Sequence, residues 1–503
     1  MSQLNRRTLY VVLGWFASRI PLYLMTTGHL WSWYGRRSIG DIIVYTRWVD
    51  GALKHGALPF GDNSWQYPPL VGPLLLLPKV LPGSDYQGQF VRLAFIADAI
   101  VILVLLLTAR RRDSWLGPWF WILSVPFLGP LIYGRFDVFS AMPVVAALAI
   151  LGRGVPVPGV QNGRKQLNGR RWIAGSLIGI GTAIKIWPGL TIFGLPRTKR
   201  GWQTIATAVS AAVAVTVVCM LSFRNGSWFL HTQGHRGIEV ESIWAVPFLL
   251  AKRAGVWHGR IHGHYGSLEV LGTGSALAGK VAIASTALVF ALLAWWWWRK
   301  QWRPAVVADA TLVATLLMIV TSRVISPQYL IWLLATAAFC LLSKDTSQRR
   351  SALLILVSLP VTQWIFPYNF TLLIHFHIST ILALTVRDAL LIAAAAIGFI
   401  DLWRDTVAGP FLPWRNRSSE PVSDASADAP SVTADPADEK EVVAREEGIA
   451  TAPEAISASQ AQAQAQAVAA APTPAAASAP VEETVDAGMA GGDPVVPAGT
   501  SQS

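Results

Sequence analysis

The sequence is poor in charged residues and nearly free of cysteine. Only 14% of its 503 residues are Asp, Glu, Lys or Arg, whereas soluble domains contain about a quarter. Hydrophobic residues make up 53% of the chain. This composition argues against an ordinary soluble enzyme and predicts an all-α polytopic membrane protein. Cys219 and Cys340 lie inside apolar runs, where a thiol usually acts as a small hydrophobe, so we assign them no chemistry.

The sequence also lacks the motifs that bind nucleotides or catalytic metals. It has no GxGxxG, Walker or HExxH pattern. Several histidines are closely spaced, but no cysteine or carboxylate pattern accompanies them. We therefore predict no metal site and no cofactor, although a need for a divalent metal stays open. An enzyme of this kind would need an activated donor delivered in the lipid. The histidines are His231, His235, His258, His262 and His264.

The net charge of +12 is unevenly distributed along the chain. From Ser418 onward fourteen acidic residues oppose two basic ones, a net charge of −12, which leaves +24 on the rest. Most of this positive charge lies in short loops between apolar runs, as the positive-inside rule requires of cytoplasmic loops. We therefore expect contact with membrane lipids and no nucleic-acid binding. The basic clusters lie at residues 6–7, 110–112, 164–171, 197–200, 299–303 and 344–350.

Apolar runs of suitable length predict about ten to twelve membrane crossings, since each span needs roughly 20 apolar residues. The candidate spans are residues 8–27, 86–108, 115–132, 136–151, 172–195, 203–222, 276–298, 304–321, 328–343, 351–367, 370–386 and 388–403.

The chain divides into a membrane domain, residues 1–405, and a tail, residues 415–503. The tail is rich in Ala, Pro, Ser, Glu and Gln, which predicts disorder, and we expect it in the cytoplasm. The membrane domain has two polar segments, residues 28–69 and 223–273, that we predict to be extracytoplasmic loops.

Two further segments do not fit a simple crossing. Residues 70–82 contain three prolines, so a broken or re-entrant helix fits as well as a crossing. Residues 172–195 have basic loops on both sides and Lys185 at their middle. That arrangement suggests a helical hairpin rather than one span.

Asp41 is the strongest candidate for a catalytic residue. It stands in GDIIVY, where an apolar segment leaves the first span, so its carboxylate can meet both water and a lipid-borne substrate. A carboxylate in this position is a plausible general base. The alternative role is a helix N-cap, for which Asp is a preferred residue.

Aromatic residues and prolines close the same loop. Trp65, Tyr67, Pro68 and Pro69 follow one another closely, and rings at this depth either anchor a protein in the membrane interface or stack on a sugar. The two prolines also fix the backbone, which would pre-form the wall of a pocket.

Several cations could hold an anionic phosphate. They are Lys185 in KIWP, Arg236 in RGIEVES beside Glu239 and Glu241, and Arg323 shortly before Gln328 and Tyr329. Each could instead extend from the membrane to the interface.

A second charged motif has a simpler explanation open to it. Arg135 and Asp137 in YGRFD lie between two apolar runs, and they could neutralise one another in a salt bridge.

In their order along the chain, these motifs resemble a known family. The motifs are GDIIVY, GALPF, YPPL, YGRFD, KIWP, RGIEVES and SPQYLIW, and the resemblance covers residues 10–405. They resemble the polyprenyl-phosphate-sugar-dependent glycosyltransferases of the C-type superfamily, and within these the actinobacterial α-mannosyltransferases, including the phosphatidylinositol mannoside mannosyltransferases. Those enzymes often have histidines after the Ser-Pro pair, where this chain has Gln328 and Tyr329.

The resemblance implies a C-type glycosyltransferase bundle in the plasma membrane and an inverting transfer on its extracytoplasmic side. Asp41 would deprotonate a hydroxyl of a glycolipid or lipoglycan, which attacks a sugar, mannose by this resemblance, on a polyprenyl phosphate. Lys185, Arg236 and Arg323 would bind the donor phosphate. The substrate pocket would include Tyr45, Tyr67, Arg135, Asp137, Glu241, Gln328 and Tyr329.

Two other functions remain open on the sequence alone. A lipid or sugar-lipid transporter would also place charged residues in broken helices, but the internal repeat of many transporters is missing. A non-catalytic envelope assembly protein could keep the fold without the reaction. An Asp41→Asn variant that behaves like wild type would favour the non-catalytic assembly protein.

Overall fold

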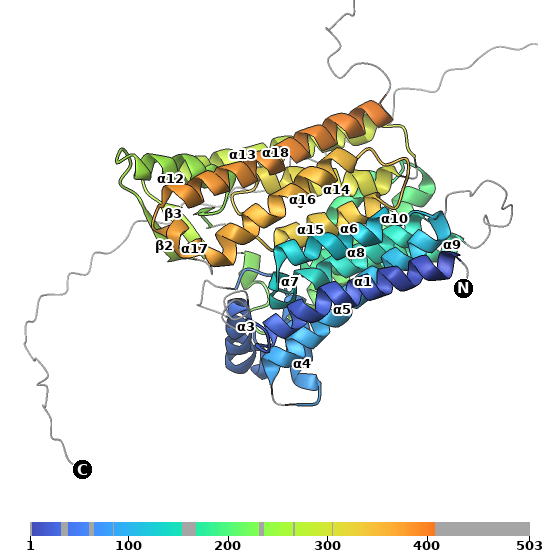
Figure 1. Cartoon of the computed structure of the whole chain (residues 1–503), viewed down its shortest axis with the longest axis horizontal. Coiled ribbons are helices and arrows are strands. Elements are labelled where there is room, and N and C mark those ends of the chain that lie inside the picture. The colour runs from blue at the N-terminus through green and yellow to red at the C-terminus, as the bar shows by residue number, and fades with distance from the viewer. Residues whose placement is uncertain are drawn as a thin grey trace, which may run out of the picture. The chain divides into compact units, whose positions relative to one another are not determined.

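The computed structural model describes residues 3–31, 39–59, 65–83, 85–152, 167–230, 236–264, 267–303 and 305–407. The predictions for the tail, residues 415–503, and for His231 and His235 fall outside these ranges. Within them the chain is a bundle of helices with three short strands at one end (Figure 1). The prediction of an all-α membrane protein is confirmed.

Within the described ranges, eleven apolar helices form most of the bundle, and α9 (Leu167–Ile184) packs among them. Six are long enough to cross a membrane, and five are shorter. The six are α1 (Gln3–Thr26), α5 (Tyr86–Arg112), α10 (Lys199–Ser222), α13 (Ser275–Arg299), α16 (Arg349–Gln363), which continues into the π turn η6 (Trp364–Tyr368), and α18 (Ile378–Thr406). The five are α4 (Val71–Val80), α6 (Leu116–Leu128), α8 (Asp137–Leu151), α14 (Val306–Thr321) and α15 (Tyr329–Cys340).

Helix α4 does not cross the membrane. Its ten residues span about 15 Å, half of the hydrocarbon core. Residues 70–82 therefore form a short helix, one of the two alternatives that the prolines left open. Of the ten to twelve crossings expected, six correspond to helices long enough to cross a membrane, and four further apolar helices, α6, α8, α14 and α15, are shorter.

The two spans predicted at residues 370–386 and 388–403 are wrong. A short helix, α17 (Phe370–Ile374), precedes one continuous helix, α18, which runs through Arg387 and Asp388. Arg387 Nε lies 2.8 Å from an Asp388 carboxylate oxygen, and both side chains are buried. Because the two charges pair inside the bundle, they do not mark the end of a span.

The helical hairpin predicted at residues 172–195 is present. Helix α9 (Leu167–Ile184) is followed by a 3₁₀ helix, η4 (Trp187–Gly194), with Lys185 at the break. Helices α9 and α10 run in the same direction, because Gly175 lies against Thr204 and Gly179 against Ala208. The η4 segment must therefore return to the side from which α9 began, and Lys185 lies at the tip of the hairpin.

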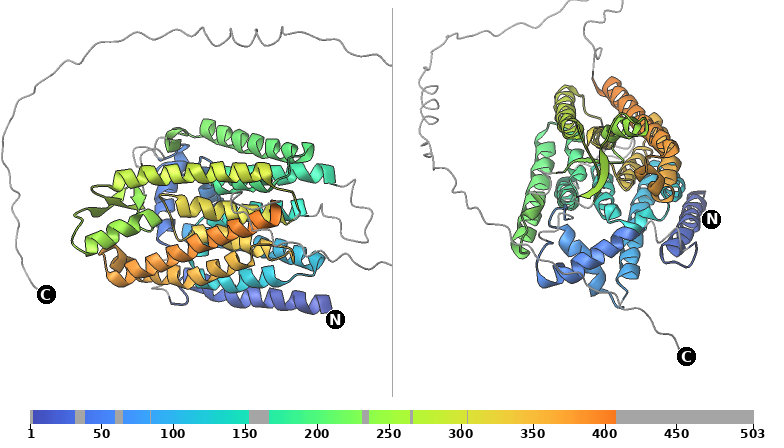
Figure 2. Two further views of the ribbon diagram at one scale, coloured as in Figure 1. Left: turned by 90° about the horizontal axis from the view of Figure 1, so that it is seen from above. Right: turned by 90° about the vertical axis from the view of Figure 1, so that its left-hand side faces the viewer.

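Helices at the centre of the bundle are buried by other helices, whereas helices at its periphery are largely exposed. Almost every residue of α15 and most residues of α14 are buried, whereas α10 and α13 run along the outside of the bundle (Figure 2). Both kinds of helix are apolar. The inner pair packs against other helices, and the outer pair presents its apolar side chains to the space that lipid fills in a membrane.

One buried ion pair lies inside the bundle far from any loop. Arg19 Nε donates to Asp98 at 2.8 Å, and neither side chain is exposed. Asp98 also accepts hydrogen bonds from Trp121 Nε1 at 2.7 Å and from the Tyr133 hydroxyl at 2.9 Å. Arg19 donates to two backbone oxygens of α6 as well. This pair joins α1, α5 and α6 with its charges compensated.

The two predicted extracytoplasmic loops meet at one end of the bundle. The first contains α3 (Gly40–Gly51) and η1 (Leu53–His55). The second contains η5 (Ile243–Ala245), α12 (Val246–Arg253) and an antiparallel sheet in the order β1 (Ile238–Glu239), β3 (Ser267–Leu271), β2 (Arg260–His264). Backbone hydrogen bonds join Arg224 to Gly56 and Leu58. We refer to this end, the left in Figure 1, as the sheet end.

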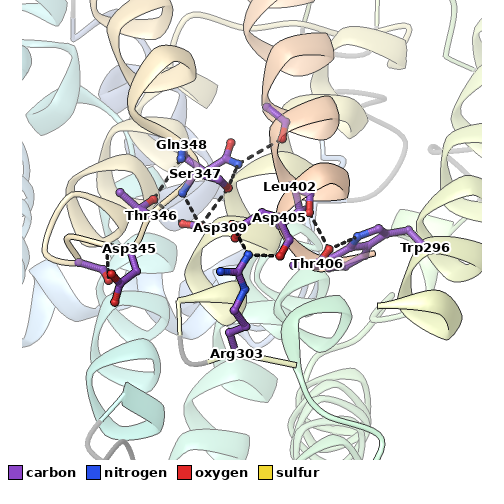
Figure 3. Close-up of polar contacts among 12 residues, drawn as sticks. Trp296, Arg303, Asp309, Asp345, Thr346, Ser347, Gln348, Leu402, Asp405 and Thr406 are labelled. Carbon is purple, nitrogen blue, oxygen red and sulfur yellow. Dashed lines mark hydrogen bonds and ion pairs between the residues drawn. The ribbon is translucent and has the colours of Figure 1, made fainter. Parts of the chain in front are cut away.

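The opposite end carries the basic loops. Arg7 pairs with Asp113 at 2.9 Å, and Arg350 and Arg303 form ion pairs with Asp401 and Asp405 of α18. Asp309 accepts hydrogen bonds from Thr346 and Ser347, and Trp296 donates to Thr406 (Figure 3). These contacts tie α13, α14, α16 and α18 together at what we call the basic end.

Candidate active site

A cavity of about 1010 Å³ opens at the sheet end. Its wall comes from both polar loops, from the hairpin tip and from the segment between α14 and α15. Nine of the eleven residues singled out in the sequence line it: Asp41, Tyr67, Arg135, Lys185, Arg236, Glu241, Arg323, Gln328 and Tyr329. Tyr45 and Asp137 lie behind the wall, both at 1% exposure.

Asp41 stands at the start of α3 with a third of its side chain exposed. Ile39 occupies the N-cap of this helix and no side chain caps it, so the N-cap alternative for Asp41 is not observed. The carboxylate of Asp41 forms an ion pair with Arg135. The predicted salt bridge between Arg135 and Asp137 is therefore wrong, because the two side chains of YGRFD pair with different partners.

Asp137 holds Lys185 at the floor of the cavity. Lys185 Nζ donates to Asp137 Oδ1 at 2.7 Å, and Trp332 Nε1 donates to the same oxygen at 2.8 Å. Asp137 begins α8, whereas Lys185 comes from the hairpin tip, so the bond joins the hairpin to the bundle. Lys185 is buried and does not extend to the interface.

Aromatic rings surround the Lys185 ammonium. Its Nζ lies between 4.8 and 5.8 Å from the centroids of four rings, those of Phe136, Trp332, Tyr329 and Tyr67. Tyr329 and Trp332 stack with centroids 4.1 Å apart, and Trp332 stacks on Trp187 at 5.6 Å. Ring faces attract a cation, so the position of this positive charge is fixed from several sides.

The aromatic residues of the first loop form a packed cluster. Trp65 is fully buried, with its ring 5.1 Å from Trp48 in a T-shaped contact, and Tyr67 packs edge-on against Phe136 at 4.8 Å. Trp65 is therefore not an interfacial anchor. Tyr45 packs against Phe90 and Phe136 and supports this wall from behind.

Arg236 and Arg323 bring two more cations to the wall. Arg323 Nη1 donates to the backbone oxygen of Arg236 at 2.7 Å, and Arg236 Nη2 donates to Ser267 Oγ at 2.9 Å. Both guanidinium groups are held by neutral partners in these bonds and line the cavity. Each therefore brings a positive charge to the wall.

Two buried carboxyl groups, Glu239 and Glu241, complete the wall. Ser326 Oγ donates to Glu239 at 3.0 Å, and Arg387 donates to the backbone oxygen of Glu241. Burial raises the pKa of both carboxyls, that of Glu241 to about 8, although Arg387 opposes this shift. Glu241 is thus protonated at neutral pH, and its Oε1 has no hydrogen-bond partner within the described ranges.

The cavity has lining residues that the sequence did not single out. Trp187 and Trp332 lie inside the quoted motifs KIWP and SPQYLIW, so those motifs already contained a signal for them. Phe366 and Phe370 also line the cavity, although the sequence predicts ordinary spans at residues 351–367 and 370–386. Pro367 between them was the only local sign of a break.

The histidines form no metal site where they can be described. Among the described residues no group of three or more His, Cys, Asp or Glu side chains could hold a metal ion. His375 Nδ1 lies 2.7 Å from the backbone oxygen of Thr371, on an exposed turn.

Comparisons with known proteins point to one family. Residues 65–327, just over half of the chain, match the sequence model of glycosyltransferase family 87. No curated protein matches the chain. Among solved structures, ArnT from Cupriavidus metallidurans bound to undecaprenyl phosphate is 14% identical, with a TM-score of 0.40 over 79% of this chain and 78% of that one. The apo state of the same protein gives a TM-score of 0.37 with the same identity and coverage.

Proposed function

The chain belongs to glycosyltransferase family 87, and we propose that it transfers mannose from a polyprenyl phosphate to a hydroxyl of a glycolipid or lipoglycan. Membership in the family and the helical bundle make it a membrane glycosyltransferase. The donor, the sugar, the acceptor and the roles of individual residues are the content of the proposal.

The observation that carries the proposal is the composition of the cavity wall. A partly exposed carboxylate, that of Asp41, lies on the same cavity as the cations of Lys185, Arg236 and Arg323. Sugar transfer from a lipid phosphate needs a base for the acceptor and positive charge for the departing phosphate. One cavity supplies both kinds of group.

A lipid-linked donor agrees with the remaining wall. Phe229, Leu230, Phe366 and Phe370 add apolar side chains to the cavity lining, which suits a hydrocarbon chain. The cavity also forms at the end of a membrane bundle, where a donor dissolved in the bilayer can reach it. The sequence has no nucleotide-binding motif that would favour a soluble activated sugar.

In the proposed reaction Asp41 takes the proton of the acceptor hydroxyl, and the hydroxyl oxygen forms a bond to the anomeric carbon. The bond between that carbon and the phosphate oxygen breaks, and its electron pair leaves with the lipid phosphate. Lys185, Arg236 and Arg323 stabilise the charge that develops on the phosphate. A single displacement of this kind inverts the anomeric configuration.

The sheet end is proposed to face away from the cytoplasm. Basic loops favour the cytoplasmic side, and in the described part they gather at the basic end, with Arg7, Arg303 and Arg350 among them. Helix α18 also ends there, at Thr406. We accordingly propose that the tail, residues 415–503, is cytoplasmic.

The test compares Asp41→Asn with Asp50→Asn in membranes supplied with radiolabelled polyprenyl-phosphate mannose. Asp50 is a matched control, because it lies on the same helix, is about half exposed and pairs with Lys79 at 3.2 Å. We expect Asp41→Asn to lower transfer by about a hundredfold or more and Asp50→Asn to leave it close to wild type. Retained binding of the donor would show that Asp41→Asn is still folded.

Three outcomes would contradict the proposal in different ways. Equal transfer by wild type and Asp41→Asn would remove Asp41 as the base. Transfer of another polyprenyl-linked sugar but not of mannose would keep the reaction and replace the sugar. Movement of labelled lipid across a vesicle membrane without any glycosylated product would favour a transporter instead.

A further inference from the structure

A second cavity, of about 310 Å³, lies at the basic end between the first turns of α9 and α10. Its volume falls in the range of small-ligand sites. We call it the basic-end pocket. Its lining residues are Arg171, Trp172, Lys199, Arg200 and Gln203, and no carboxylate is among them.

The three cations of the basic-end pocket have no anionic partner in the described part of the chain. Other arginines at this end do have one, since Arg7, Arg303 and Arg350 each pair with an aspartate. Nη1 of Arg171 is buried and has no hydrogen-bond partner among the described residues. Like charges held side by side repel each other, and a bound anion would relieve that repulsion.

Exposed tryptophans place the pocket at the depth of lipid head groups. The side chain of Trp172 is 60% exposed and forms part of the pocket wall. Trp202, one turn into α10, is 52% exposed and contacts Trp297, whose neighbour Trp298 is exposed too. Tryptophan rings on the outside of a membrane bundle gather where hydrocarbon meets head groups. A free anion in water would not need such a belt.

We propose that the basic-end pocket binds the phosphate of an anionic phospholipid, with Arg171, Lys199 and Arg200 around the phosphate and Trp172 against the glycerol and upper acyl chain. Basic pockets between membrane helices on the cytoplasmic side suit anionic head groups. The inference does not depend on the sugar-transfer reaction, because none of these residues lines the large cavity.

Binding at this position would link the N-terminal ends of α9 and α10, which already pack closely further along their lengths. At Gly175 and Gly179 the backbone of α9 lies against α10, whereas near the starts of the helices the pocket separates Arg171 of α9 from Arg200 of α10. A lipid phosphate held by Arg171 of α9 and Arg200 of α10 would fill that separation. It would thereby fix the base of the hairpin that carries Lys185.

The experiment uses the full chain purified in phosphatidylcholine nanodiscs with and without phosphatidylglycerol. The readouts are the thermal unfolding midpoint and the lipids retained in native mass spectrometry. The variant is Arg171→Gln with Arg200→Gln. The control is Arg110→Gln with Arg111→Gln, which removes two exposed charges from the same end outside the pocket. A third variant, Arg171→Lys with Arg200→Lys, keeps the charge.

We expect phosphatidylglycerol to raise the midpoint of wild type, the control and the Lys variant. The Gln variant should bind it about 30-fold more weakly, since each cation near an anionic head group contributes roughly five- to sixfold. Equal retention by the Gln variant and wild type would overturn the proposal. So would inorganic phosphate that stabilises wild type as well as the lipid does, because the pocket would then hold a free anion. If the Gln variant fails to fold, the Lys variant tests the proposal. Loss of phosphatidylglycerol retention in the Lys variant would then overturn the phosphate site.

Discussion

Two buried acid-cation pairs lie in the same bundle and differ in what surrounds them. Arg19 and Asp98 are enclosed, and their polar groups are bonded to α1, α5 and α6. Lys185 and Asp137 are also buried, but Lys185 lines a cavity of about 1010 Å³. The first pair uses its bonds to join helices. The second keeps a charge at the edge of a space that a substrate can enter.

The difference shows how to interpret an ionisable residue within a membrane span. Burial and a good ion pair occur at both positions, so neither feature identifies a functional site. What separates them is the cavity, which Lys185 lines and which neither Arg19 nor Asp98 lines. Arg135 Nε, Glu241 Oε1 and Gln328 Oε1 are buried around the cavity without a hydrogen-bond partner in the described ranges. A substrate can satisfy such atoms.

The largest effect is expected from breaking the enclosed pair on one side only. Asp98→Ala leaves Arg19 buried without its counter-ion, which costs about 3–5 kcal/mol of stability. Unfolding in mixed detergent should show the loss, and the double variant Arg19→Met/Asp98→Asn should recover most of it. If Asp98→Ala unfolds at the same point as wild type, the pair does not stabilise the bundle.

The next effect separates the two pairs by activity. Lys185→Met with Asp137→Asn removes both charges while the Asn oxygen can still accept from Trp332. We expect this variant to fold and to lose mannose transfer by about a hundredfold. Arg19→Met/Asp98→Asn serves as its control and should transfer at close to the wild-type rate. A similar loss of mannose transfer in both double variants would mean that Lys185 and Asp137 have no specific role in catalysis.

A smaller effect concerns pH. Burial raises the pKa of Glu241 from 4.5 to about 8, so between these values the folded state binds a proton that the unfolded state has released. Stability from this group is present below pH 4.5 and is lost as pH rises toward 8, by at most about 1.4 kcal/mol per pH unit. Melting of wild type and Glu241→Gln from pH 5 to 9 should show a weaker decline in the variant. Parallel curves would exclude a protonated Glu241.

The smallest effects should distinguish a residue that lines the cavity from a residue that packs behind the cavity wall. Tyr67 lines the cavity, whereas Tyr45 packs behind it. Tyr67→Phe should lower transfer a few-fold with little change in stability. Tyr45→Phe should leave transfer unchanged and lower stability by about 1 kcal/mol, because it removes the hydrogen bond between the buried Tyr45 hydroxyl and the backbone of Phe136. Transfer and melting measured on the same preparations would check both, and a reversed order would contradict the placement.

Much of the site could be predicted because its residues stand in short, ordered motifs. Asp41, Tyr67 and Lys185 were chosen from local features, an acid after a span, a proline-fixed ring and a cation inside an apolar run. The basic loops on both sides of residues 172–195 and Lys185 at their middle predicted the hairpin for the same reason, since both are local features.

The partners of these residues could not be predicted in the same way. Arg135 pairs with Asp41 and Asp137 with Lys185 because α3 and the hairpin tip reach the start of α8 from distant parts of the chain. In sequence the nearest opposite charge is two positions away, and that proximity suggested the wrong bridge. For the same reason the sequence predicted two spans separated at Arg387, where the structure has the single helix α18. The charge of Arg387 is compensated in the folded bundle by Asp388.

The returning hairpin has a consequence for reporter fusions. Because α9 and η4 return the chain to the basic end, the start of α1 and the end of α18 both lie at that end (Figure 1). With the basic end proposed to be cytoplasmic, a fluorescent protein that matures only in the cytoplasm should fluoresce when inserted next to Gln3 or after Val407. The same reporter placed beside Gly255, in the turn that follows α12, should stay dark.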